Sequence, residues 1–296
     1  MFEYKTVKKL SSKQKPITLQ VKDDNNEEDG VNQQRSHEDY LFRQHNPARS
    51  AVRSLSEWDE YENFFDGDEQ ANNLVGTPAN DSIFGHWGND TIWGMDGNDH
   101  IRDWDPGVQG FDDDHPSDDD LIFGGDGDDY VSTMRGSDTV FGGEGRDHIY
   151  SNGSESWLYG GLGADVISKV NGGSRIFGGR GSDDIMIEGS GGINVVSGGP
   201  GADRISFFPY RRRFPTRITV TDLERSDTIR ILNSPQRHEI NRVDNDIVID
   251  TVPRNYAESP ERLFVLQGIG DQINDWRLFA NQAAELPYVE FAYANF

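Results

Sequence analysis

The chain of 296 residues contains no cysteine, few basic residues and no long apolar run. The absence of cysteine excludes disulfide bonds, thiolate metal sites and thiol catalysis. No stretch approaches the roughly 18 consecutive apolar residues of a membrane-spanning helix. The 28 lysines and arginines stand against 52 aspartates and glutamates, which gives a formal charge of −24. A chain of this charge is expected to repel nucleic acid and anionic lipid and to attract cations.

Two common catalytic signatures are also missing. No GxSxG occurs, and His37-Glu38 and His238-Glu239 lack the second histidine of HExxH. We therefore expect a protein that is not an enzyme. The first residues, MFEYKTVKKLSSKQK, carry charge without an apolar segment, so we expect no cleaved secretory signal there.

Residues 1–72 form a polar N-terminal segment with little periodicity. VKDDNNEEDGVNQQRSHED is acidic and free of aromatics, which predicts disorder. Residues 48–65 have better helical spacing, with Val52, Leu55 and Trp58 near one face, and predict a short helix. This helix would cap the next domain or bind a partner.

A pattern of nine residues runs from Gly76 to residue 206. Two of its copies are GGDGDDYVS at 124–132 and GGEGRDHIY at 142–150. The eighth position is always apolar: Ile83, Ile92, Ile101, Ile122, Val131, Val140, Ile149, Leu158, Ile167, Ile176, Ile185, Val196 and Ile205. One inward aliphatic residue per short strand is the pattern of a parallel solenoid.

The pattern resembles the RTX, or haemolysin-type calcium-binding, repeat GGxGxDxUx. The resemblance covers residues 76–206 and implies an all-β fold, a right-handed parallel β-roll in which each nonapeptide forms one turn and one strand. Two nonapeptides would make one coil of 18 residues. The resemblance also implies calcium ions between the turns of successive coils, held by aspartates and by turn carbonyls, which are the hard oxygen ligands that calcium prefers.

Because successive copies would alternate between two sides of the roll, we sort their turns into two rows. In row one the sixth position is always aspartate: Asp81, Asp99, Asp129, Asp147, Asp165, Asp183 and Asp203. In row two it is Asp90, Asp120 and Asp138, followed by Ser156, Ser174 and Asn194. The seven turns of row one leave six gaps, so we expect up to six ions there and a mostly empty row two.

The resemblance assigns the calcium ligands residue by residue. They are the row-one aspartates, Asp90, Asp120 and Asp138 of row two, and the turn glycines Gly124, Gly125, Gly127, Gly142, Gly143, Gly145, Gly160, Gly161, Gly163, Gly178, Gly179, Gly181, Gly198, Gly199 and Gly201.

Stacked carboxylates make the expected fold depend on these ions. Row-one carboxylates would lie about 5 Å apart, the spacing of neighbouring strands. Each pair of like charges at that distance costs about 1–3 kcal/mol. Summed over a row, this repulsion is comparable to the whole stability of a domain. We therefore expect calcium to drive folding, at the concentrations typical of extracellular calcium modules.

An acidic insertion over residues 103–117 interrupts row two. The stretch 103–120 holds eight aspartates. We interpret the insertion as a solvated loop that bulges from the roll. The alternative is an extra calcium site built from Asp103, Asp105 and residues 112–114.

The ninth position of row-two copies is aromatic at Trp93, Phe123, Phe141, Tyr159 and Phe177. With the eighth position inward, this aromatic stripe should face outward. Another segment of the chain would cover it, or a protein or glycan partner would bind it.

Residues 207–296 are expected to form a β-rich cap. Segments such as ITVTDL and NDIVID alternate with period two. The cluster PYRRRFPTR at 209–217 would neutralise the acidic roll or bind an anionic partner. The tail from residue 274 is expected to hold a short helix and, by resemblance to RTX proteins, an uncleaved export signal.

The sequence thus predicts a calcium-binding β-roll protein that is secreted without a signal peptide, by a type I-like route. Its expected role is non-enzymatic, at a surface, in a matrix or in an interaction. The alternatives are an exported effector that uses the roll for folding and export, and a polysaccharide-acting enzyme with an unrecognised site.

Overall fold

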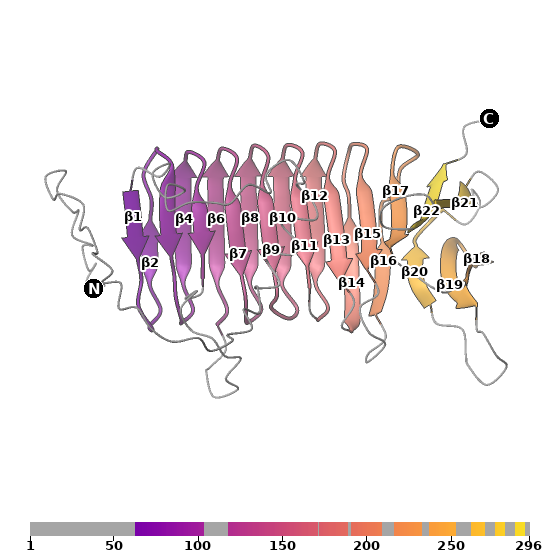
Figure 1. Ribbon diagram of the computed structural model, residues 1–296, viewed down its shortest axis with the longest axis horizontal. Coiled ribbons are helices and arrows are strands. Elements are labelled where there is room, and N and C mark those ends of the chain that lie inside the picture. The colour runs from indigo at the N-terminus through magenta and orange to yellow at the C-terminus, as the bar shows by residue number, and fades with distance from the viewer. Residues whose placement is uncertain are drawn as a thin grey trace, which may run out of the picture. The chain divides into compact units, whose positions relative to one another are not determined.

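The computed structural model describes residues 63–103, 118–170, 172–188, 191–208, 216–232, 237–252, 262–269, 276–281 and 288–293. These residues form 22 strands and no helix (Figure 1). The disorder expected for the segment of residues 1–72 falls mostly on residues 1–62, which lie outside the described ranges, whereas residues 63–72 are described and include a strand. Most of the helix expected over residues 48–65 also lies outside the described ranges, while residues 63–65 belong to strand β1 (Asn63–Asp66). They are strand because β1 pairs in parallel with the next coil, Asn63 with Asp81.

The strands alternate between two sheets, which we call sheet A and sheet B (Figure 1). Sheet A contains β1, β3 (Asp81–Phe84), β5 (His100–Arg102), β7 (Tyr130–Thr133), β9 (His148–Ser151), β11 (Val166–Lys169), β13 (Asp184–Glu188), β15 (Arg204–Phe208) and β17 (Thr228–Leu232). Sheet B contains β2 (Asn73–Val75), β4 (Thr91–Asp96), β6 (Leu121–Asp126), β8 (Thr139–Glu144), β10 (Trp157–Leu162), β12 (Arg175–Arg180), β14 (Gly192–Ser197) and β16 (Thr216–Val220).

Neighbouring strands in this part of each sheet are parallel, as in a β-roll. Ile149 pairs with Ile167, and Ile167 pairs with Ile185, so each coil advances the chain by 18 residues. The step across the acidic insertion is 30 residues. The predicted all-β parallel roll is confirmed.

The core lies between the two sheets and is one aliphatic residue deep per strand. All thirteen residues at the eighth repeat position are buried, none more than 1% exposed, and they belong to one hydrophobic cluster. Their neighbours on either side in the strands are mostly less buried. This alternation follows from the opposite directions of successive side chains in a strand.

The C-terminal strands extend both sheets with antiparallel pairs. In sheet B, β18 (Arg237–Val243), β19 (Asp246–Val252) and β20 (Arg262–Leu266) lie beyond β16, and β20 is parallel to β16. In sheet A, β22 (Tyr288–Tyr293) pairs with β17 and β21 (Trp276–Asn281) pairs with β22. The β-rich C-terminal region is therefore present.

The short helix expected in the tail is wrong for the described residues. Both tail segments are strands, because β17 offers them an edge whose backbone groups need partners. Arg230 Nε also donates to Glu290 Oε2 at 2.6 Å, which ties β22 to β17. Among the described residues, no helix has the length and apolarity needed to cross a membrane.

The thin core predicts a strong effect of a single truncation. Ile167→Ala removes a fully buried side chain and should lower the free energy of unfolding by about 2–5 kcal/mol. Ile193→Ala is the control, because Ile193 is 59% exposed, and it should change this free energy by about 0.5 kcal/mol or less. Denaturant unfolding in calcium measures both, and equal losses would contradict this core.

Candidate metal centre

The row-one aspartates form a continuous ladder at the start of the sheet A strands. All seven are buried. In the six that follow Asp81, Oδ1 accepts a hydrogen bond from the backbone N–H of the equivalent aspartate one coil earlier. The N–O distances are 2.8 Å for Asp81 to Asp99, 2.8 Å for Asp99 to Asp129, 3.0 Å for Asp129 to Asp147 and 2.9 Å for Asp147 to Asp165, Asp165 to Asp183 and Asp183 to Asp203.

The other carboxylate oxygen in this ladder has no hydrogen-bond partner. This holds for Oδ2 of Asp99, Asp129, Asp147, Asp165, Asp183 and Asp203. Each lies against the first glycine of its own turn. A Cβ added to Gly142, for example, would lie 2.3 Å from Asp147 Oδ2 and 2.5 Å from the carbonyl oxygen of Gly160. Glycine therefore leaves open a small space between an aspartate and a carbonyl of the next coil.

The second and fourth turn positions also favour glycine, although Met95 takes the second position of one turn with φ of 89°. Gly143 and Gly145 both have φ of 129°, a region that side chains with a Cβ rarely adopt. The predicted glycines Gly125, Gly127, Gly161, Gly163, Gly179, Gly181 and Gly199 share a positive φ. Buried carboxylate oxygens without partners, next to turn carbonyls, are the donor set that suits calcium. The residues present thus fit the ion.

Burial makes these carboxylates costly to ionise. Burial, together with repulsion from the neighbouring carboxylates of Asp147 and Asp99, raises the pKa of Asp129 to about 8. Burial likewise raises the pKa of Asp99, Asp147 and Asp203 to about 7 and that of Asp165 to about 6, and it raises the pKa of Asp183. A bound cation would offset this penalty.

Row two continues the same ladder with different side chains. Asp90 N donates to Asp120 Oδ1 at 2.7 Å, and Asp120 N donates to Asp138 Oδ1 at 3.2 Å. The later acceptors are neutral: Ser156 Oγ at 3.4 Å, Ser174 Oγ at 3.1 Å and Asn194 Oδ1 at 3.1 Å. Serine and asparagine therefore keep the hydrogen bond and remove the charge.

After its first turn, which begins with Gly85, row two also differs at the first position of its turns, where all seven row-one turns have glycine. Thr133, Ser151, Lys169, Ile187 and Phe207 are in register in successive coils, and all are buried. We call this series the inner column.

Lys169 places an ammonium group inside the roll. Its side chain is 1% exposed, its Nζ donates to the Gly153 carbonyl, and Asp138 attracts its charge. Burial lowers the pKa of Lys169 to about 8. A fixed cation thus lies beside the last aspartate of row two.

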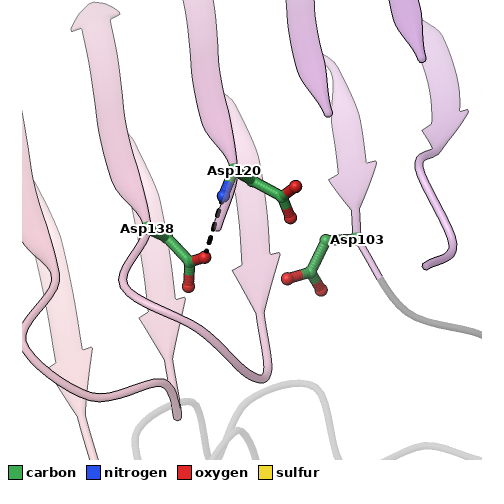
Figure 2. A group of neighbouring side chains, drawn as sticks. All are labelled: Asp103, Asp120 and Asp138. Atoms are coloured by element: carbon green, nitrogen blue, oxygen red, sulfur yellow. Dashed lines mark hydrogen bonds between the residues drawn. The ribbon is translucent and has the colours of Figure 1, made fainter. Parts of the chain in front are cut away.

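The structure brings Asp103 together with Asp120 and Asp138 (Figure 2). Each offers an oxygen, and these oxygens lie within 4.8 Å of one another. Asp103 follows β5, where Arg102 pairs with Ser132, so Asp103 begins the inner column one coil before Thr133. The alternative site with Asp105 and residues 112–114 lies outside the described residues.

Four further residues bond to the ladders in the structure but were not predicted from the sequence. Asp203 N donates to Asp227 Oδ1 at 3.0 Å, which extends row one by a turn. Asp222 accepts from the backbone N–H groups of Gly198 and Gly199 at 3.1 and 3.0 Å. In the first coil, Asn63 Nδ2 donates to Asp81 Oδ1 at 2.7 Å and Asn72 N donates to Asp90 Oδ1 at 2.8 Å.

A signal for Asp227 exists in the sequence. Residues 226–229, SDTI, repeat the pattern SDTV of residues 137–140. The step from Asp203 to Asp227 is 24 residues, however, so the strict period of nine hides it.

The aromatic stripe is a stacked column on sheet B. Trp93 and Phe123 stack with centroids 6.0 Å apart, Phe123 and Phe141 at 5.1 Å, Phe141 and Tyr159 at 4.7 Å, and Tyr159 and Phe177 at 4.9 Å. All five rings are half-buried. Trp157 adds an exposed ring beside Tyr159 and Phe177.

A family model supports the interpretation of these turns. The model of the RTX calcium-binding nonapeptide repeat matches four copies, at residues 66–101, 117–140, 132–167 and 186–207. The chain carries an RTX calcium-binding repeat domain. RTX repeats bind calcium, and proteins that contain them are typically secreted. No curated protein matches the chain.

The raised pKa values of the RTX ladder predict the pH dependence of the calcium-free protein. Because the folded-state pKa values of Asp99, Asp129 and Asp147 rise from 3.8 to about 7 or 8, these groups stabilise the fold fully below about pH 3.8. That contribution is lost as the pH rises through 7 to 8. In calcium-free buffer, the β-structure content measured by far-ultraviolet circular dichroism should therefore be higher at about pH 5.5 than at about pH 8. A β-structure content that rises with pH in this interval would contradict the assignment.

Proposed function

We propose that this protein is folded by calcium and that row one holds the ions. Six consecutive row-one turns each contain a buried Oδ2 without a hydrogen-bond partner, and this observation carries the proposal. Each ion would lie between two successive turns and take oxygens from the aspartates and glycine carbonyls assigned above. Up to about six ions would fill the row. Calcium supplies the positive charge that these buried carboxylates lack.

The contrast between the rows supports one calcium row. Beyond Asp138, row two offers neutral Ser156, Ser174 and Asn194, which do not repel one another and do not attract a cation. Lys169 adds a positive charge of its own at this end. Row-two binding is therefore limited to the turns around Asp90, Asp120 and Asp138.

Calcium-dependent folding supports the proposal that this protein acts outside the cell. Extracellular modules bind calcium at about 10⁻⁴–10⁻³ M, so a chain with such sites stays loose until export. We propose export without a cleaved signal peptide and a role at a surface, in a matrix or in an interaction. The aromatic stripe is the surface we assign to a protein or glycan partner, because its flat stacked rings stay partly accessible.

A substitution that removes the charge of one row-one carboxylate and keeps its shape tests whether row one binds calcium. Asp147→Asn keeps an oxygen that can accept from Asp129 N, but it removes the charge from two neighbouring gaps. It should reduce the calcium stoichiometry by about two ions or weaken those sites at least about tenfold, because calcium needs charged ligands to offset its dehydration. Isothermal titration calorimetry measures both quantities.

Two controls accompany this variant. Asp126→Asn removes an exposed carboxylate from the turn before, and Ser156→Ala removes a neutral row-two acceptor. Both should leave the calcium stoichiometry unchanged. If Asp147→Asn binds as many ions as Asp126→Asn with the same affinity, row one is not the calcium row.

A further inference from the structure

Asp103 is a buried carboxylate outside the repeat pattern. Its side chain is 0% exposed. Oδ2 accepts from Met134 N at 3.1 Å, whereas Oδ1 is buried without a hydrogen-bond partner. One carboxylate oxygen of Asp103 lies within 4.8 Å of one oxygen of Asp120 and one of Asp138. Oδ2 of Asp120 and Oδ2 of Asp138 are also buried without a hydrogen-bond partner. In Figure 2, the Asp103 and Asp138 carboxylates point toward each other from opposite sides.

The fold does not need a charge at this position. The next residues of the inner column, Thr133 and Ser151, fill the same place with neutral hydroxyl groups. The bond to Met134 N needs only an oxygen. The charge of Asp103 is in fact unfavourable, because Asp120, Asp138 and Asp118 all repel it. A buried charge of this kind calls for a partner of opposite sign.

The surroundings concentrate negative charge further. Asp118 is 3% exposed and lies close enough to raise the pKa of Asp120, while Asp90 lies one turn away along row two. Burial is the largest cause of the raised pKa of Asp120, and Asp118 and Asp138 add to it. The positive charge of Lys169 offsets part of the negative charge next to Asp138. Asp103 lies directly after β5, where the insertion begins.

We propose that Asp103, Asp120 and Asp138 form a separate calcium site at the base of the acidic insertion, tighter than the row-one sites. A row-one gap offers two aspartates, whereas this site offers three carboxylates, and calcium affinity rises with the charge of the ligands. Backbone carbonyls and water would complete the six to eight oxygens that calcium takes. This site therefore fills first as calcium rises. The inference rests on the proposed function, because it assumes that the repeat domain folds around calcium.

The experiment removes the third carboxylate and follows calcium binding by calorimetry. Asp103→Asn keeps the acceptor for Met134 N, and Asp103→Ser copies the residue that the inner column has at Ser151. Each should weaken the tightest class of sites at least about tenfold, or remove one ion from it, while the row-one class is unchanged. Without calcium, each variant should show at least as much residual β-structure as the wild type by far-ultraviolet circular dichroism, because a buried repulsive charge is gone.

The matched control is Asp147→Asn, which should leave the tightest class of calcium sites unchanged and weaken binding to the row-one class of sites. Wild-type calcium affinity and stoichiometry in both Asp103 variants would overturn the inference, as would a loss of β-structure in the calcium-free variants without any change in calcium binding. If the wild-type chain binds no calcium, the proposed function itself fails. If the Asp103 variants bind calcium as the wild type does while Asp147→Asn binds it less well, the proposed function stands and the separate site is refuted.

Discussion

The structure depends on one hydrogen bond repeated along both edges of the roll. A side-chain oxygen at the sixth repeat position accepts from the backbone N–H of the equivalent residue one coil earlier, as Asp147 accepts from Asp129. Because coils touch only their neighbours, this contact fixes each turn on the next. Aspartate, serine and asparagine all supply the oxygen, and the choice among them decides whether a turn carries a buried charge. Row one is charged throughout, and row two becomes neutral after Asp138.

The inner column shows how the roll replaces that charge along row two. It begins with the carboxylate of Asp103, continues with the hydroxyls of Thr133 and Ser151, reaches the ammonium of Lys169 and ends with apolar Ile187 and Phe207. The same position in successive coils thus changes from a carboxylate to hydroxyl groups, then to an ammonium group and finally to apolar core side chains. In row one, glycines such as Gly142 leave this space open. This difference in charge and space between the two sides of the roll supports the proposal that calcium binds mainly along row one.

Much of this arrangement can be predicted from sequence, because in a strict repeat the position of a residue within the repeat fixes its place in the turn or strand. Ile149 and Asp147 follow directly from a period of nine and the alternation of side chains along a strand. Where the period breaks, prediction fails. The 24-residue step hid Asp227, and the 30-residue step hid the meeting of Asp103 with Asp138. The tail strands β21 and β22 were expected in part as helix, because their pairing depends on the edge of β17 and not on local pattern.

The central claim is that uncompensated carboxylates keep the roll from folding without calcium. Far-ultraviolet circular dichroism at about pH 7.5 tests this directly, with calcium raised from a chelated start to about 1 mM and above. The account predicts a cooperative gain of β-structure with calcium and little gain with magnesium, whose strict octahedral geometry suits such sites poorly. A full β-sheet spectrum in the chelator, unchanged by calcium, would contradict it.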